Sequence, residues 1–173
     1  GAVVQGGGLT NAGTVYVEAT TGATLDGVEV NNTGGTVQVD VSEVAATLLL
    51  DDGTTITSGK LSLGNSGEVE IGAGGAGLTD VTVFNGTGDV PTGEILIDSG
   101  AILTLTESSV TGGKIVNDGT ATVSGTLTLS GANSYSGATT VTGGTLALGA
   151  SNVLADATNV PVGSGGTLDL RTN

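Results

Sequence analysis

A short phrase returns along the whole chain: a glycine, then a run in which apolar and polar residues alternate, then another turn. A unit this short cannot bury its own apolar face, whereas stacked copies can bury one another's. Repetition of this kind predicts a solenoid, in which each copy packs on its neighbours. The copies occupy residues 13–18, 35–40, 59–63, 67–71, 93–97, 113–116, 125–129, 144–148 and 166–170.

The alternation within each copy predicts strands. Val15 and Val17 alternate with Thr14 and Tyr16, a pattern that places apolar side chains on one face of a strand and polar ones on the other. Residues that favour turns, such as the pair Asp26-Gly27, separate the runs. The chain is therefore expected to be all-β.

The spacing of equivalent phrases gives the length of one coil. The phrase that begins at Gly13 begins again at Gly35, and a second phrase that begins at Ala23 begins again at Ala46, after nearly the same interval. Each coil divides into three short runs, first at 14–18, 23–25 and 28–31, then at 36–40, 46–50 and 54–57. These spacings predict a right-handed parallel β-helix, a solenoid with about three short strands per coil of roughly 22–23 residues.

Two further expectations follow from this register. Residues 72–77 and 86–92 are predicted to be loops inserted into a coil, because they interrupt the alternation. One apolar residue from each of several copies is predicted to point inward and to form a single column through the stack. Its members would be Val15, Val37, Leu61, Ile95, Ile115, Leu127 and Leu146.

An antiparallel β-sandwich is the alternative architecture, with Asp26-Gly27 as a two-residue hairpin turn. A sandwich needs a thick core with some aromatic filling. This chain has 2% aromatic residues, namely Tyr16, Phe84 and Tyr135. A narrow solenoid lined by Val, Leu, Ile and Ala suits the composition better.

The charge balance excludes some partners. Three basic residues stand against 17 acidic ones, so the formal net charge is −14. Such a chain repels phosphate backbones, and we expect no nucleic-acid partner. No stretch is long and apolar enough for a spanning helix, and we expect no membrane insertion by this segment. The chain contains no Cys, His or Met, which removes thiolate and imidazole ligands and suggests a fragment of a larger protein.

Carboxylates are the remaining candidates for chemistry. Glu68 and Glu70 are neighbours on the same face of one expected strand, at a separation suited to an acid–base pair, but Lys60 is the one basic residue near them in the sequence. Asp51 and Asp52 precede a glycine, and carboxylates in such turns can bind Ca²⁺. Asp51 and Asp52 are therefore the candidate metal site, calcium is the one candidate cofactor, and no catalytic residue is expected.

Threonine is abundant at the outward positions of these runs. A flat, regular threonine array can bind ice. However, no Thr-x-Thr column repeats at a fixed interval along the sequence, and such an array is not expected.

The stretch 125–148 reads GTLTLSGANSYSGATTVTGGTLAL and resembles the autotransporter-associated β-strand repeat, with Asn133, Tyr135, Gly137 and Thr140 at marked positions. The resemblance divides the chain into irregular β-helical repeats (1–124) and a repeat of this family (125–173), in one continuous solenoid. It implies a passenger or stalk segment of a bacterial exported protein, without catalysis.

The function expected from the resemblance is structural. The chain would be a segment of a cell-surface or secreted adhesin, or of an extracellular fibre. Its partners would be host-cell, matrix or neighbouring-cell surface components, or further copies of itself in fibres. The alternatives are a carbohydrate-active β-helix domain, of the polysaccharide lyase or hydrolase kind, and a calcium-stabilised surface-layer or filament component. The expected location is extracellular or on the bacterial cell surface.

Overall fold

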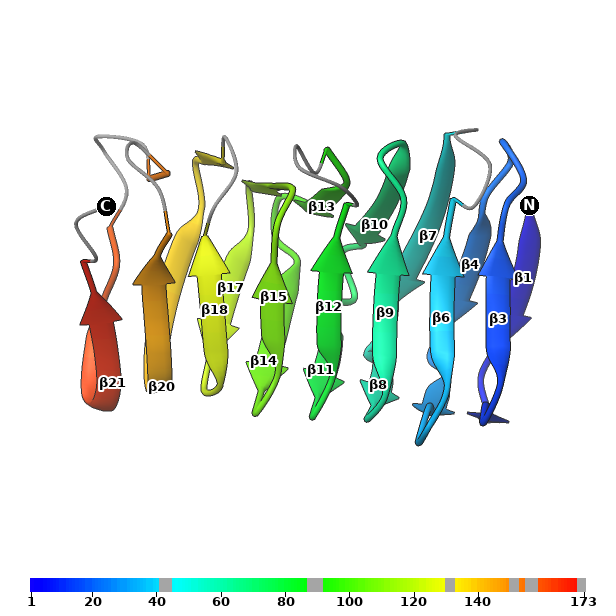
Figure 1. Ribbon diagram of the computed structural model, residues 1–173, viewed down its shortest axis with the longest axis horizontal. Coiled ribbons are helices and arrows are strands. Elements are labelled where there is room, and N and C mark those ends of the chain that lie inside the picture. The colour runs from blue at the N-terminus through cyan, green and yellow to red at the C-terminus, as the bar shows by residue number, and fades with distance from the viewer. Residues whose placement is uncertain (41–44, 87–91, 130–132, 150–152, 155–158, 171–173) are drawn as a thin grey trace.

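The computed structural model describes residues 1–40, 45–86, 92–129, 133–149, 153–154 and 159–170. Within these ranges the chain is a parallel β-solenoid of about seven turns and contains no helix. Three strands, joined by corners, make one coil, and equivalent strands of successive coils pair in parallel to form three walls. Figure 1 shows the coils stacked side by side from one end of the molecule to the other.

The first wall forms a seven-stranded sheet. Its strands are β1 (Ala2–Gln5), β4 (Ala23–Asp26), β7 (Ala46–Asp51), β10 (Gly67–Ile71), β13 (Glu94–Ile97), β16 (Lys114–Asn117) and β19 (Ser134–Tyr135).

The second wall begins with β2 (Gly8–Thr10), β5 (Glu29–Asn31), β8 (Thr54–Thr57), β11 (Ala76–Thr79), β14 (Ile102–Thr106) and β17 (Thr120–Val123). The third wall contains β3 (Thr14–Val17), β6 (Thr36–Val39), β9 (Lys60–Leu63), β12 (Thr82–Asn85), β15 (Ser109–Thr111) and β18 (Thr126–Leu129). The long strand β20 (Ala138–Leu148) pairs with both β17 and β18, and β21 (Val162–Asp169) pairs with β20, so these two walls form one 14-stranded sheet.

The solenoid winds in a right-handed sense. In Figure 1 the strands of the third wall run upward on the near side, and the chain then crosses the top and descends in the first wall on the far side. The stack advances from right to left at the same time, which makes the winding right-handed. The predicted right-handed parallel β-helix is confirmed.

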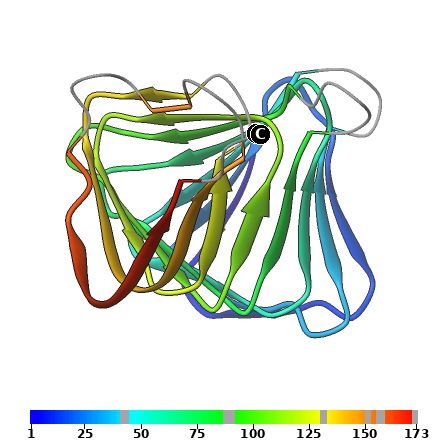
Figure 2. The same ribbon diagram turned by 60° about the vertical axis from the view of Figure 1, so that its left-hand side comes forward.

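The alternation of the sequence is reproduced as alternation of burial. In β6 the side chains of Val37 and Val39 are buried, whereas Thr36 and Gln38 are half-buried on the outer face. Inward residues from all three walls form one hydrophobic cluster that runs the length of the stack. The walls enclose this interior in the view of Figure 2. The strands expected in the first two coils agree closely with β3 to β8, with small differences at their ends.

The sandwich alternative is wrong, because every strand pairing in the described part of the chain is parallel. Asp26-Gly27 turns the corner from β4 to β5, which lie in different walls.

The loop predicted at 72–77 is also wrong. Residues 72–75 form an ordinary corner, and Ala76 and Gly77 already belong to β11. Of the loop predicted at 86–92, residues 87–91 lie outside the described residues.

The predicted constant coil length is wrong beyond the first coil. Thr14 pairs with Thr36, at the predicted interval, but Ala23 pairs with Leu48 and not with the predicted Ala46. Thr82 pairs with Ser109 over a longer stretch of chain, and Ser109 pairs with Thr126 over a shorter one. The strands from β1 to β18 all stay short, so the corners absorb the differences. A parallel ladder constrains the paired strands and leaves the length of the connection free.

The single inward column is wrong for two of its seven members. Val15, Val37 and Leu61 do stack in one column of the third wall, and Leu127 and Leu146 continue it. Ile95 and Ile115 are buried as predicted, but they pair with each other in the first wall. Val83 and Val110 occupy the corresponding places in the third wall.

Candidate functional site

The corner between the first and second walls carries a column of polar side chains. Gln5, Asp26 and Asp51 are in register in successive coils, and the Gln5 amide donates a hydrogen bond of 2.8 Å to the Asp26 carboxylate. Asp51 Oδ1 accepts hydrogen bonds from the backbone N–H groups of Asp52, at 2.9 Å, and Gly74, at 2.7 Å. Asp51 thereby ties one corner to the next coil, which is a structural role.

The same corner contains the predicted calcium site. Asp52 is exposed, with a φ of 50°, beside the Asp51 carboxylate. Within the described ranges, no group of three or more carboxylate, thiolate or imidazole side chains is placed to hold a metal ion. Ca²⁺ takes six to eight oxygen ligands, so these two aspartates would have to be joined by backbone carbonyls and water. The site stays a prediction.

Melting temperature in different salts tests this prediction. We expect NaCl and CaCl₂ both to raise it above its value in low salt with a chelator, because salt screens repulsion among the carboxylates. A calcium site at Asp51 and Asp52 adds a further increase in CaCl₂ over NaCl at equal ionic strength. Asp52→Asn, which still tolerates positive φ, should remove that increase. Equal melting temperatures in the two salts would exclude the site.

Glu70 lies on the outer face of the first wall, between Leu49 of β7 and Leu96 of β13. Desolvation by these surroundings raises the pKa of Glu70 above its ordinary value of 4.5. The carboxylates of Asp98, Glu68 and Asp51 raise it further, and a hydrogen bond with Asp98 acts in the same direction. Glu70 is thus easier to protonate in the folded protein than a free glutamate.

This shift predicts how Glu70→Gln changes the pH dependence of stability. The folded protein binds the Glu70 proton more tightly than the unfolded chain, so protonation stabilises the fold. That stabilisation is complete below about pH 4.5 and is lost as the pH rises through the folded-state pKa. We therefore expect Glu70→Gln to be more stable than wild type at pH 7, by under about 1 kcal/mol after solvent screening. The gain should vanish near pH 4.

Urea denaturation of both proteins between pH 4 and pH 7 measures the difference. Glu29→Gln is the matched control, because it removes the same charge from β5 in the second wall. An equal gain in the control would attribute the effect to net charge. A gain for Glu70→Gln that is the same at pH 4 and pH 7 would contradict the raised pKa.

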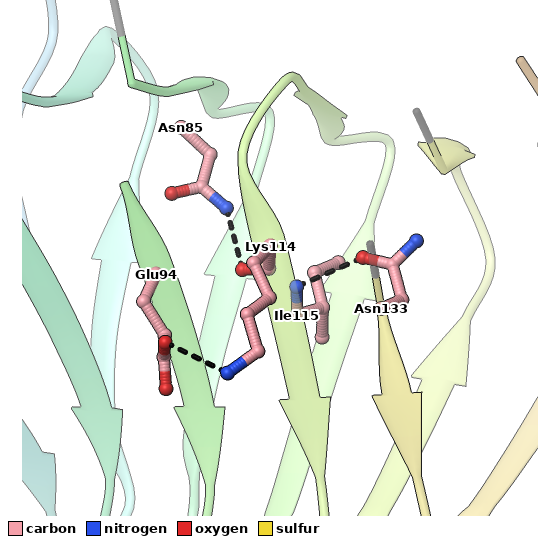
Figure 3. Close-up of polar contacts among 5 residues, drawn as sticks. All are labelled: Asn85, Glu94, Lys114, Ile115 and Asn133. Carbon is pink, nitrogen blue, oxygen red and sulfur yellow. Dashed lines mark hydrogen bonds and ion pairs between the residues drawn. The ribbon is translucent and has the colours of Figure 1, made fainter. Parts of the chain in front are cut away.

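Glu68 faces a different environment from Glu70. It accepts a hydrogen bond of 3.2 Å from the Thr47 hydroxyl and is in register with Glu94 of the next coil. Glu94 in turn forms an ion pair of 3.1 Å with Lys114, which Figure 3 shows across β13 and β16. Lys60, the basic residue near Glu68 in the sequence, lies on β9 in the third wall. The ion pair could not be predicted from the sequence, because its members lie in different coils and are far apart along the chain.

The residues that mark the family resemblance make contacts between coils. Asn133 Oδ1 accepts a hydrogen bond of 2.9 Å from the Ile115 N–H (Figure 3), and Asn133 Nδ2 donates one of 3.2 Å to the Val153 carbonyl. A Cβ at Gly137 would overlap the Gly119 carbonyl oxygen of the preceding coil. Both roles concern the stacking of one coil on the next, and neither needs a substrate.

The outer face of the second wall contains two aligned columns in which threonine recurs. One column contains Gly8, Glu29, Thr55, Gly77, Thr104, Thr122 and Thr140. Beside it runs a second column of Thr10, Asn31, Thr57, Thr79 and Thr106. The Thr-x-Thr pairs of β8 and β14 thus fall in the same two columns. Gly77 of β11 stands between them, and the intervals between column members change from coil to coil, so no regular Thr-x-Thr array forms over these coils.

Two open hollows interrupt this face, each of about 420 Å³. The first lies over β2, β5 and β8, with Gly8 and Glu29 in its lining, and the second lies over β8, β11 and β14, with Gly77 in its lining. Thr55 lines both hollows. These shallow, open hollows, together with Glu29, Asn31 and Gly77 in the columns, interrupt the regular threonine array that would suit an ice surface.

Residues 124–148 match the model of one protein family, described as passenger-associated-transport-repeat. This match and the β-solenoid fit an autotransporter passenger repeat. No curated protein and no solved structure matches the chain. Across the ranges that the structure describes, no helix is long and apolar enough to cross a membrane.

Proposed function

We propose that this chain is a structural stalk segment in the passenger of a bacterial exported protein, located on the cell surface or secreted, without catalysis of its own. The observation that carries the proposal is the match of residues 124–148 to a passenger repeat. The parallel pairing extends from β1 to β21 through that repeat. A spacer requires this continuity, because each coil transmits load to the next through its backbone ladders.

The dimensions and chemistry of the solenoid suit a spacer. Coils stack at the strand spacing of about 4.8 Å, so about seven coils extend about 30 Å. The Asn11 amide donates a hydrogen bond of 2.7 Å to the side-chain oxygen of Asn32. These two residues lie at equivalent corners of neighbouring coils, so the bond joins one coil to the next. The exposed carboxylates keep such a rod soluble and resist aggregation through its side walls.

Surface labelling tests the location. In cells that produce the parent protein, antibodies against this segment should label intact, unpermeabilised cells or recover the segment from the medium. External protease should remove the cell-bound signal. Labelling that requires permeabilisation would place the protein inside the cell and would overturn the proposal.

A stalk also predicts that whole coils can be removed. Deletion of residues 36–59 joins Gly35 to Lys60, which is the register partner of Thr36. The resulting protein should fold and shorten by about 4.8 Å, measurable by small-angle scattering. The matched control, deletion of residues 36–47, removes part of a coil and should disrupt folding. Equal tolerance of both deletions would contradict a rigid stack.

The carbohydrate-active alternative makes a different prediction. The purified protein would then release reducing ends or unsaturated sugars from a polysaccharide, and Glu68→Gln or Glu70→Gln would abolish that release. We expect no product from either the wild type or the variants. Release that depends on these carboxylates would replace the stalk proposal by an enzymatic one.

A further inference from the structure

We propose that the groove on the outer face of the second wall binds an uncharged polysaccharide chain, laid across the strands and along the solenoid axis. This inference goes beyond the stalk role and does not depend on it. A stalk without a bound glycan remains a stalk, and the groove can bind glycan wherever the protein is located.

The first argument is a glycine that the fold does not require. Gly77 is in register between Thr55 and Thr104, in a column that otherwise carries side chains over these coils. Its φ is not positive, and a Cβ built there would meet the Thr55 methyl group at an ordinary contact distance of 3.5 Å. By contrast, Gly75 has a φ of 75° and is required by its corner. At Gly77 the missing side chain serves to open the hollow.

The second argument is the shape of the groove. Both hollows lie in line along the axis and meet at Thr55. From Gly8 to Thr104 the column crosses four coil spacings, which amounts to about 19 Å. Its length and its open sides suit a linear polymer better than a compact small molecule.

The third argument is the chemistry of the lining. The second hollow is lined by Thr55, Thr79 and Thr104, by glycine backbone and by the exposed side chain of Ile102. None of the described residues that line the second hollow is charged, and Glu29 is the one charged residue in the lining of the first. Hydroxyl groups both donate and accept hydrogen bonds, and together with apolar contacts they match the hydroxyl and C–H groups of a sugar.

The fourth argument is the charge on both edges. Asp52 and Asp98 lie in the corners that precede β8 and β14, and Asp80 and Glu107 follow β11 and β14. A strand of four residues is about 13 Å long, so both edges lie within about one Debye length of the groove centre. These carboxylates repel polyanions such as nucleic acids and polyuronates, so among polysaccharides they favour an uncharged chain over an anionic one.

A peptide ligand fits less well. The groove crosses the face of a sheet whose backbone N–H and C=O groups already pair along the ladders. Strand addition, the usual way of binding an extended peptide, requires a free edge. Side-chain hydroxyls remain as the available partners, and they favour a polyhydroxyl chain.

Calorimetric titration of the folded protein with cellohexaose and with chitohexaose tests the proposal, with a guluronate hexamer as the polyanion. We expect at least one neutral hexasaccharide to bind, its disaccharide to bind much more weakly, and the guluronate hexamer not to bind. Gly77→Thr should fill the hollow and weaken binding at least about tenfold, while the melting temperature stays equal or rises because threonine favours strands.

Gly13→Thr is the matched control. The atom nearest to a Cβ at Gly13 is 4.0 Å away, its φ is not positive, and it lies outside both hollows. This variant should bind like wild type. Thr104→Val, which keeps the shape and removes the hydroxyl, provides a second test should Gly77→Thr not fold. The proposal is overturned by no binding of either neutral hexasaccharide, by equal binding of guluronate, or by full binding in a folded Gly77→Thr or Thr104→Val.

Discussion

Val37→Asp is expected to destabilise the protein by several kcal/mol and to unfold much of it at room temperature. The Val37 side chain is 2% exposed and stacks between Val15 and Leu61 of the neighbouring coils. A carboxylate there would lie among aliphatic side chains, which offer it no hydrogen bond. An unpaired buried charge carries a large desolvation cost, and total stabilities are only about 5–15 kcal/mol.

Gln38→Asp is the matched control for this prediction. Gln38 is the next residue on the same strand, but it faces outward between Tyr16 and Ser62. A carboxylate at Gln38 keeps its water, so the cost should stay under about 1 kcal/mol. Chemical denaturation of the two variants measures the contrast. Similar losses at both positions would show that the inward and outward faces of the third wall are wrongly assigned.

Asn32→Ala is expected to cost about 2–3 kcal/mol. The Asn32 side chain is fully buried in a corner of the stack. Its amide donates to the carbonyls of Ser58, at 3.3 Å, and Lys60, at 3.0 Å, in the next coil, and its oxygen accepts from Asn11 of the previous one. Removing the Asn32 side chain takes a hydrogen-bond partner from buried polar groups of the two neighbouring coils. Buried groups without partners carry the full cost of their desolvation.

The neighbouring residue again provides the control. Asn31 is exposed, and its oxygen accepts hydrogen bonds from Thr33 within its own corner. Asn31→Ala should therefore cost under about 1 kcal/mol. Thermal and urea unfolding of both variants decide the comparison. An Asn32→Ala protein as stable as wild type would mean that the corner repacks or admits water, and that the stack does not depend on its asparagine contacts.

The sequence by itself determined the local features of this protein. Alternation at period two is a property of neighbouring residues, so it identified strands such as β6 and the inward direction of Val37 and Val39. The turn pair Asp26-Gly27 marked the corner between β4 and β5. Composition also excluded a thick aromatic core. For the first coils, a constant spacing even gave the correct pairing of Val15 with Val37.

The tertiary structure alone decided which residues of distant coils lie side by side. Coil lengths vary because the corners absorb insertions that leave the ladders intact, and no local pattern records that variation. Ile95 and Ile115 were therefore assigned to the wrong column, and the threonine columns of the second wall went unnoticed. The same holds for the groove. In the sequence, nothing distinguishes Gly77 from the other glycines. Only its register between Thr55 and Thr104 shows that it lines a hollow.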